Sequence, residues 1–376
     1  MSKTAIPEKI KNQLLVKSAG RCQYRGCNKS LYNDIVTKRN FNQSYIAHIV
    51  GDIPTGPRGD VVLSPLLAQD LSNLMLMCDA HHRLIDIVDE SGHPEALLLV
   101  MKKEHECRVE IATAILPNMH SHVLTYKANV GMHTPEMSYQ SLSDYLKPDY
   151  YPAIADTIDL SLSNSLQRDR DAVFWATEED NLTAQFNRKL LQNFTKGEIK
   201  HLSIFAFAPI PLLIRLGTLI NDIYSAEIYQ PVRNPKTWKL NEETTEVKYI
   251  VTHAVDKHKT VALNISLSGT ITNDRITEII GHEVSIYTIT IGTPFNDYLK
   301  SRRHLQDFSV EMRKLFDYIK ANHLADTPIH IFPAMPIAKA IELGRVWMPK
   351  ADMPLYIYDQ NTANGGFTKV IEIVNK

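Results

Sequence analysis

The sequence predicts two folds in one chain: a small α+β region at the N-terminus and a larger α/β region after it. Three observations lead to this division. Cysteine and histidine pairs with metal-ligand spacing fall between residues 22 and 81, residues 118–150 show little strand or helix periodicity, and strand and helix patterns alternate beyond them. We therefore divide the chain into residues 1–118, a connector at 119–150, and residues 151–376.

The composition is that of an ordinary globular protein, with 44% hydrophobic and 22% charged residues in 376. No apolar run approaches the roughly 18–20 residues of a membrane span, and the first residues lack the apolar segment of a signal peptide. Four cysteines do not make a disulfide scaffold in a chain of this length. We expect a cytoplasmic protein that does not contact a membrane.

The N-terminal region alternates short regular segments with turns. PEKIKNQLLVKSAG (7–20) predicts a helix, with Pro7 in its first turn and Gly20 beyond its end. YIAHIV (45–50) predicts a short strand, and the prolines and glycines of GDIPTGPRGD (51–60) predict a loop. Two further helices are expected, HHRLIDIV (81–88) and PEALLLVMKKEHECRVEIATAIL (94–116).

Positive charge is concentrated at the start of the chain, although the net charge is only −1. Residues 1–40 hold nine lysines and arginines against two acidic residues. Such a local face can hold phosphates even in a neutral protein. On charge alone, a solvated surface helix is the simpler interpretation of the same residues.

Two pairs of residues have the spacing of zinc ligands. Four residues separate Cys22 from Cys27, two separate Cys78 from His81, and about fifty separate the pairs. This fits a tetrahedral structural zinc site with three thiolates and one imidazole. The alternative is that the cysteines are small buried hydrophobic residues, but both pairs lie among polar turn residues.

The segments RCQYRGC, AHIVGDIPTGPRGD and LSNLMLMCDAHHRLID resemble the zinc-bearing branch of the HNH nucleases over about residues 10–95. The resemblance implies a ββα-metal fold in which His48 is the general base, Asn73 orients the base or its loop, and His82 binds a catalytic Mg²⁺ or Mn²⁺. Since His81 then belongs to zinc, the two adjacent histidines serve different centres. The acidic residue that many relatives carry just before the first histidine is absent here, and Asp52 and Asp86 are the possible replacements.

The C-terminal region contains an internal repeat. HLSIFAFAPIPLLIRLG (201–217) and IHIFPAMPIAKAIELG (329–344) share a strand pattern, a proline and a helix ending in Leu-Gly, at a constant offset of 127. Two strand–loop–helix–strand units predict a pair of Rossmann-like halves. A chance match is the alternative, because α/β proteins often repeat strand, proline and helix.

The segments AFAPIPLLIRLG, VALNISLSGTIT and IHIFPAMPIAKAIELGRVWMPKADMPLYIYDQN resemble the SAVED domain, which consists of two fused CARF-like halves. We place these halves at about 151–270 and 271–376. Fusions of HNH and SAVED domains are effectors of cyclic-oligonucleotide-based antiphage (CBASS) systems. The resemblance implies that a cyclic di- or trinucleotide binds SAVED and drives a resting monomer or dimer into a higher oligomer, such as a tetramer, that degrades double-stranded DNA.

Loops at the carboxyl ends of strands are the expected ligand site in such a sheet. The candidate residues are Pro209, Arg233, Lys236, Trp238, Ser268, Thr270, Met335 and Pro336. The two cations and the tryptophan suit phosphate and base contacts. Trp238 could instead be a packed tryptophan, and Ser268 a helix cap.

Three functions are compatible with these features, and the first of them is the one we predict. The first is a ligand-activated DNA endonuclease, and the second an ungated restriction-type HNH enzyme whose C-terminal region reads DNA. Residues 126–376 hold 27 basic and 29 acidic residues, a poor balance for reading DNA. The third is a zinc-dependent binding module without catalysis, for which His48→Ala would change nothing.

Overall fold

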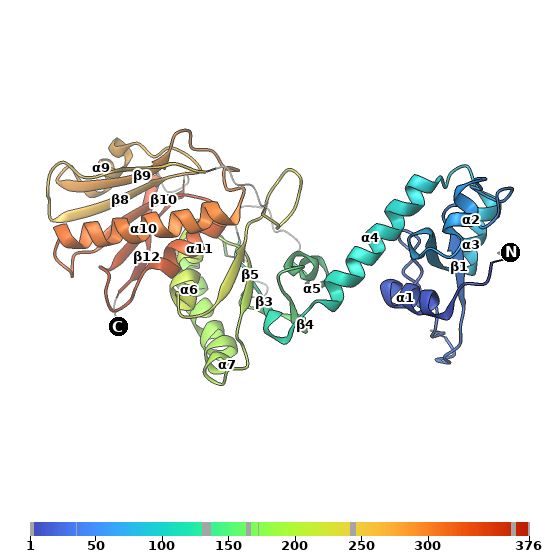
Figure 1. Ribbon diagram of the computed structural model, residues 1–376. Helices are drawn as coiled ribbons and strands as arrows, with labels where there is room; N and C mark the ends of the chain where they lie inside the picture. The colour runs from blue at the N-terminus through green and yellow to red at the C-terminus, as the bar shows by residue number, and fades with distance from the viewer. Residues whose placement is uncertain are drawn as a thin grey trace. The chain divides into compact units, whose positions relative to one another are not determined.

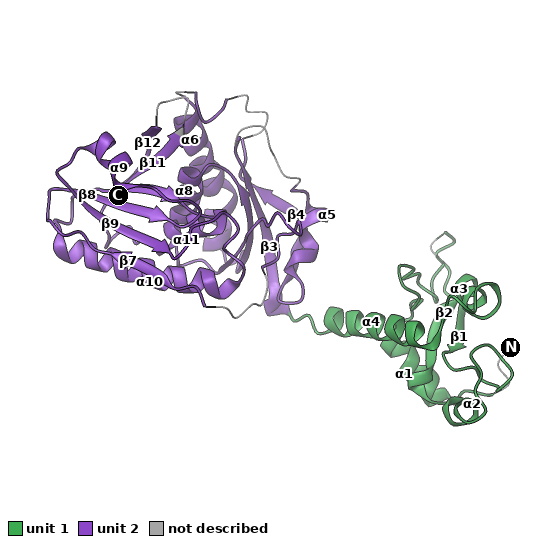
Figure 2. Cartoon of the chain, turned by 90° about the horizontal axis from the view of Figure 1, so that it is seen from above, with its two compact units in different colours: residues 1–116 green, residues 117–376 purple. Residues whose placement is uncertain are grey.

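The computed structural model describes residues 4–34, 36–129, 137–162, 167–171, 173–240, 246–361 and 366–374. The chain forms two compact units, residues 1–116 and residues 117–376 (Figure 2). Among the described residues, no helix is both long enough and apolar enough to cross a bilayer.

Unit 1 is built on an antiparallel pair of strands with helices around it (Figure 1). Its elements are α1 (Glu8–Ser18), β1 (Ser44–His48), α2 (Leu63–Leu67), η1 (Leu71–Asn73), β2 (Leu74–Cys78), α3 (Asp79–Arg83), the π-helical turn η2 (Leu84–Val88) and α4 (Glu95–Thr113). In the pairing of β1 with β2, His48 lies opposite Leu74. All of β2 is buried, as its apolar sequence LMLMC requires.

The helix limits in unit 1 follow local sequence. Pro7 precedes α1 and Pro94 precedes α4, positions where a missing N–H is not needed. At the end of α1, Ala19 and Gly20 both have positive φ, and the N–H of Gly20 returns to the carbonyl of Leu15. The expected helix at 81–88 begins two residues earlier, at Asp79, and widens into η2.

Unit 2 contains two sheets. The first has the order β4-β3-β5-β6 and is wholly parallel, from β3 (His120–Lys127), β4 (Tyr151–Asp159), β5 (Leu202–Phe207) and β6 (Ala226–Tyr229). The second has the order β12-β11-β10-β8-β9-β7, from β7 (Tyr249–Thr252), β8 (Thr260–Ser266), β9 (Val284–Ile291), β10 (Ile329–Ala334), β11 (Leu355–Asn361) and β12 (Gly366–Ile373). Its four central strands are parallel, and β7 and β12 are antiparallel edges.

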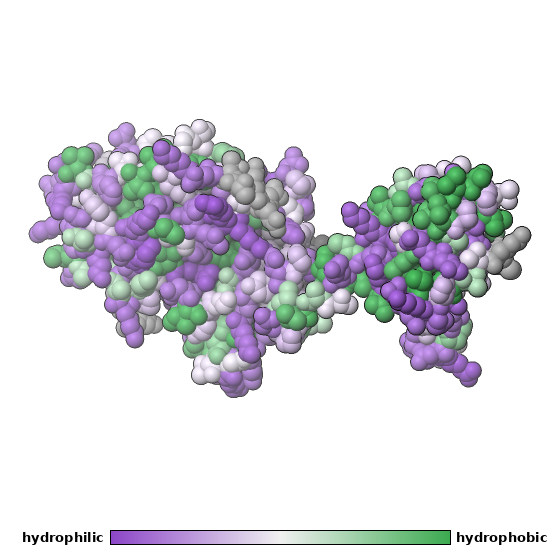
Figure 3. All heavy atoms as spheres, in the orientation of Figure 1, coloured by the Kyte–Doolittle hydropathy of each residue, from purple (hydrophilic) through white to green (hydrophobic). Residues whose placement is uncertain are grey.

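The helices of unit 2 link these strands. They are η3 (Pro117–Met119), α5 (Tyr139–Leu142), η4 (Ser143–Leu146), α6 (Phe174–Phe186), η5 (Asn187–Leu191), α7 (Gln192–Thr195), α8 (Ile210–Ile220), α9 (Asn273–Ile280), α10 (Arg302–Asn322) and α11 (Ile337–Val346). The largest apolar core includes buried residues of α8, α10 and α11 and of both sheets. In Figure 3 the visible surface of this unit is mostly hydrophilic, as expected when apolar side chains fill such a core.

The predicted repeat forms two equivalent units, β5-α8-β6 and β10-α11-β11, each with parallel strands. The two helices pack directly against each other at the repeated glycines. A Cβ on Gly217 would lie 2.0 Å from the carbonyl oxygen of Ile341, and a Cβ on Gly344 would lie 2.1 Å from that of Ile214. The four positions correspond at the offset of 127, so each helix gives the other the same contact.

The segment expected as a connector contains regular structure. Residues 120–127 form β3, which lies between β4 and β5 and buries Val123, Leu124 and Tyr126. A parallel strand buried on both faces has no alternating pattern, and the mixed sequence HSHVLTYK of β3 gives no periodic signal. The following α5 and η4 also pack on this sheet, through Leu142 and Leu146.

The two sheets divide unit 2 earlier than the expected boundary at residue 270. Strands β7 and β8 both belong to the second sheet, where β8 pairs with β9 and β10. The division therefore falls before Tyr249. The sequence did not reveal this because neither strand belongs to the repeated segment.

Candidate metal centre, catalytic cavity and ligand pocket

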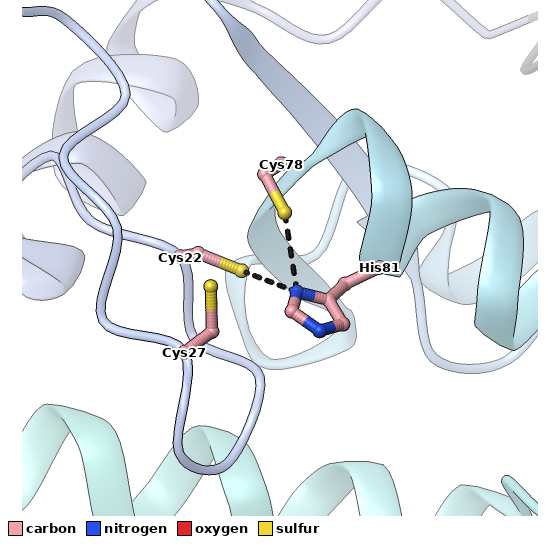
Figure 4. A group of neighbouring side chains, drawn as sticks. All are labelled: Cys22, Cys27, Cys78 and His81. Atoms are coloured by element: carbon pink, nitrogen blue, oxygen red, sulfur yellow. Dashed lines mark hydrogen bonds between the residues drawn. The ribbon is translucent and has the colours of Figure 1, made fainter. Parts of the chain in front are cut away.

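The side chains of Cys22, Cys27, Cys78 and His81 converge in unit 1, and their ligand atoms all lie within 4.8 Å of one another (Figure 4). The Nδ1 atom of His81 is 3.1 Å from the Sγ of Cys78 and 3.7 Å from that of Cys22. Two sulfur ligands of a tetrahedral zinc ion are about 3.8 Å apart, since each Zn–S bond is about 2.3 Å. The donor set and its spacing therefore fit a structural zinc ion.

Hydrogen bonds hold the first cysteine pair against β2. The N–H of Gln23 donates to the carbonyl of Leu76, and the N–H of Leu76 donates to the Gln23 Oε1 atom, at 2.9 and 2.7 Å. The ring of Tyr24 stacks on His81 with 4.1 Å between centroids. Burial raises the pKa of the Cys22 thiol to about 12, so a bound cation is needed to keep this sulfur as a thiolate.

A second group of side chains lines a cavity of about 120 Å³ in the same unit. Four of the residues named from the sequence meet there: His48, Asp52, His82 and Asp86. His82 follows His81 directly on α3, yet it lines this cavity while His81 lies among the cysteines. Burial lowers the pKa of His82, which favours the neutral imidazole that a cation needs.

His48, at the end of β1, is buried and has one defined hydrogen bond. Its Nε2 atom donates to the carbonyl oxygen of Ala68 at 2.9 Å. Because the carbonyl can only accept, the proton of the neutral ring lies on Nε2 and Nδ1 is left as the basic nitrogen. The Asp52 Oδ1 atom is 3.7 Å from Nε2, where a carboxylate stabilises the protonated ring.

Asn73 is absent from the residues that line the cavity and acts on the loop behind it. Its Oδ1 accepts from the N–H of Val50 at 2.7 Å, and its Nδ2 donates to the carbonyls of Val50 and Leu67 at 2.9 and 3.2 Å. These bonds fix the backbone just after His48. The asparagine therefore positions the loop that carries the cavity wall.

Arg58 is a cavity residue that the sequence did not identify. Its guanidinium donates to the carbonyls of Ile49 and Ile85 at 2.8 and 2.6 Å and to Asp86 Oδ1 at 2.5 Å. It thereby joins the end of β1 to η2. These contacts are made across the fold, so the position of Arg58 in a loop gave no signal of them.

Unit 2 contains a cavity of about 540 Å³ at the carboxyl ends of strands from both sheets. Phe207 ends β5, Gln230 follows β6, Ser268 follows β8 and Met335 follows β10. Its lining residues are Ser141, Tyr145, Phe207, Gln230, Pro231, Val232, Arg233, Lys236, Thr237, Trp238, Ser268, Asn296, Asp297, Met335, Pro336 and Ile337. The volume is within the range of small-molecule sites.

Six of the eight ligand residues expected from the sequence line this cavity, and Pro209 and Thr270 do not. Pro209 is buried at the start of α8, and Thr270 is exposed beyond the lining residue Ser268. Trp238 is only 7% exposed and packs edge-on against Phe205, so it forms part of the cavity wall.

The cavity combines the groups that a nucleotide needs. Arg233 and Lys236 are exposed cations, Tyr145 and Phe207 are half-buried aromatic residues, and Asp297 is a half-buried carboxylate. Tyr145 comes from the segment expected as a connector, which is why the sequence did not reveal it. Cations suit phosphates, and aromatic faces suit bases.

A family model described as "SMODS-associated and fused to various effectors sensor domain" (SAVED) matches residues 182–373. No curated protein matches the sequence.

Solved structures of low sequence identity are also similar to this chain. One is a Cap4 SAVED/CARF-domain containing receptor from Acinetobacter baumannii with the cyclic trinucleotide 2'3'3'-cAAA. It is 14% identical to this chain and has a TM-score of 0.44, and the match covers 73% of this chain and 56% of the receptor chain. The corresponding receptor from Moraxella osloensis is 13% identical, with coverages of 73% and 54% and a TM-score of 0.41. The chain thus spans little more than half the length of these structures.

Proposed function

The chain belongs to the SAVED family of sensor domains, and from this premise we propose that it is a metal-dependent DNA endonuclease activated by a cyclic oligonucleotide. The observation that carries the proposal is the placement of His48 and His82 in one cavity, beside a Cys₃His cluster, in a chain that also contains a sensor domain. A sensor domain alone needs no such cavity. The biological role would be CBASS-type antiphage defence.

The activator would bind in the cavity of unit 2. Its two exposed cations suit the phosphates of a cyclic di- or trinucleotide, and Tyr145 and Phe207 offer aromatic faces to its bases. The walls come from loops that follow strands of both sheets. A ligand there would contact both halves of the sensor and so bias how they pack.

Hydrolysis of the phosphodiester would take place at the cavity of unit 1. The Nδ1 atom of His48 would accept a proton from the attacking water, and Asp52 would stabilise the imidazolium that results. Asn73 would keep the loop after His48 in place. A Mg²⁺ or Mn²⁺ ion held through His82 would supply charge neutralisation at the scissile phosphate and the leaving oxygen.

The zinc ion would have a structural role. The four ligands come from the loop after α1 and from the junction of β2 and α3, which carries His82. Zinc would therefore fix the start of α3, the helix that carries the proposed metal-binding residue His82.

Double-stranded DNA is the proposed substrate, and self-association the proposed activation step. One catalytic cavity cuts one strand, so a duplex break requires two units acting together. We expect a resting monomer or dimer that forms a larger oligomer, such as a tetramer, with ligand. Duplex cleavage by ligand-saturated protein that light scattering shows to be monomeric would contradict this step.

Plasmid cleavage tests the proposal. Wild type, His48→Ala and the exposed-histidine control His282→Ala are incubated with Mg²⁺, with and without each of a panel of cyclic di- and trinucleotides. We expect cleavage only with one of these nucleotides, retained in His282→Ala and reduced at least about a hundredfold in His48→Ala. Nucleotide-independent cleavage lost in His48→Ala would favour the ungated restriction-type enzyme, and no cleavage under any condition would contradict the nuclease.

A further inference from the structure

Many HNH nucleases carry an acidic metal ligand just before the first histidine, where this chain has Tyr45, Ile46 and Ala47. We infer that Asp86 supplies the carboxylate ligand instead, so that His82 and Asp86 together form the protein part of the divalent-cation site. The inference rests on the proposed nuclease function and identifies which of two candidate carboxylates completes its metal site.

His82 and Asp86 have the geometry of neighbouring ligands. They are four residues apart across the junction of α3 and η2, and His82 Nε2 is 3.5 Å from Asp86 Oδ2. Adjacent ligands of an octahedral Mg²⁺ are about 3.0 Å apart, since each bond is about 2.1 Å. A shift of about half an ångström would place both atoms on one ion.

Accessibility also favours this pair. The side chains of His82 and Asp86 are 25% and 24% exposed, so water and a phosphate oxygen can reach an ion between them. A Mg²⁺ ion keeps several waters and is commonly held by few protein groups. Two protein ligands beside an open cavity suit that preference.

Arg58 orients the Asp86 carboxylate. It donates to Oδ1 at 2.5 Å, while the second oxygen, Oδ2, is the one near His82. Its guanidinium is fixed by the carbonyls of Ile49 and Ile85. Carboxylates that bind metals are commonly held by a further hydrogen bond of this kind, so Arg58 is a positioning residue.

Asp52 has a different environment, beside His48, the proposed general base. Its Oδ1 is 3.7 Å from His48 Nε2, and its Oδ2 accepts from the N–H of Thr4 at 3.1 Å. Its side chain is only 7% exposed, which leaves little room for a hydrated cation. These contacts assign Asp52 to the stabilisation of protonated His48.

Binding of Mn²⁺ to the zinc-loaded chain of 376 residues tests the inference without relying on cleavage. Electron paramagnetic resonance of free Mn²⁺ gives the affinity and number of sites for wild type, His82→Ala, Asp86→Asn, Asp86→His and Asp52→Asn. We expect one site that His82→Ala removes, that Asp86→Asn weakens at least about tenfold, and that Asp52→Asn leaves within about threefold. Asp86→His restores a ligand and should recover most of the affinity.

The variants are designed to separate binding from folding. Asparagine at position 86 retains an oxygen acceptor for Arg58, so thermal melting and zinc content should match wild type. If Asp86→Asn does not fold, weak Mn²⁺ binding by Asp86→His would itself contradict the ligand role.

Two outcomes overturn the inference in distinguishable ways. If His82→Ala removes the Mn²⁺ site while Asp86→Asn binds as wild type, or if Asp52→Asn loses the ion instead, the assignment of Asp86 is wrong and the nuclease proposal stands. If wild type has no Mn²⁺ site that depends on His82, both proposals fail.

Discussion

At the scale of single residues, the loop after β1 shows how an uncharged side chain can organise a candidate active site. The side-chain amide of Asn73 bonds to both the N–H and the carbonyl of Val50, two residues after His48. These two hydrogen bonds resemble those that a neighbouring strand would make to the backbone of Val50. Both bonds are buried. Replacement therefore leaves backbone groups without partners in an environment that water does not reach.

We predict that Asn73→Ala destabilises unit 1 by about 2–4 kcal/mol, because the donor and acceptor of Val50 both lose their partner. Thermal or urea unfolding followed in the full chain measures this change. Asn33→Ala is the control, since that side chain is exposed and so is Asn40, with which it forms a hydrogen bond. Equal stabilities of the two variants would contradict the positioning role.

The sequence predicted the position of a side chain correctly where short spacing along the chain keeps two residues close together in the fold. Two short cysteine and histidine pairs predicted a four-residue cluster, and the structure brings these four residues together. It did not identify Arg58, whose guanidinium contacts residues up to 28 positions away. It also included Pro209 and Thr270 in the ligand site, because adjacency to a strand end does not say which way a loop faces.

At the scale of elements, the cysteine loop is tied to β2 and α3 by side chains of the proposed zinc site. The core of unit 1 is small, and both Cys22 and Cys78 belong to it. A metal ion that joins such segments contributes directly to folding.

We predict that removal of zinc by a strong chelator unfolds unit 1 and leaves unit 2 folded. Structural zinc binding is worth about 10 kcal/mol or more, so no small core can replace it. Calorimetry of the full chain should show one transition that moves to lower temperature with chelator and returns with added zinc. A melting profile that does not respond to chelation would exclude a structural metal.

The crossing of α8 and α11 depends on two glycines at equivalent positions of the repeat. We predict that Gly217→Ala destabilises unit 2 by about 1–3 kcal/mol or more, because the added methyl group meets the carbonyl of Ile341 and forces the helices apart. Chemical unfolding measures the effect. Gly292→Ala is the matched control, since a Cβ there meets nothing within 4 Å and the change should stay within about 0.5 kcal/mol.

Helices whose ends are marked by proline or glycine could be predicted from the sequence. Strands whose positions depend on burial in the folded chain could not. Prolines and glycines marked α1 and α4, and the repeat predicted both strand–helix–strand units. Strands β2 and β3 were not predicted. The short apolar run LMLMC of β2 does not distinguish a strand from a helix, and the mixed sequence HSHVLTYK of β3 shows no clear alternation.

At the scale of the whole molecule, the candidate catalytic cavity and the candidate ligand cavity are formed by residues of different units. Every residue that lines the small cavity belongs to unit 1, and every residue that lines the large cavity belongs to unit 2. Substitutions in the large cavity therefore test whether it controls the small one, because they leave the catalytic residues untouched.

We predict that the double substitution Arg233→Ala and Lys236→Ala raises by at least about tenfold the concentration of cyclic nucleotide needed for DNA cleavage, since charged hydrogen bonds to phosphate are worth about 1.5–3 kcal/mol each. The maximal rate at saturation should stay within about threefold of wild type. The control is Lys257→Ala with Lys259→Ala, two exposed lysines outside the cavity. Equal shifts in both double variants would point to a general effect of charge.

The reciprocal contact at Gly217 and Gly344 also bears on the ancestry of the sensor. The glycine of each helix lies against the carbonyl three residues before the glycine of the other helix, as in two identical subunits related by a dyad. A shorter chain carrying one such helix would meet a second copy of itself through the same surface. Duplication and fusion of a gene for a homodimer would produce this architecture. A larger residue in place of either glycine would then require a compensating change in the opposite half.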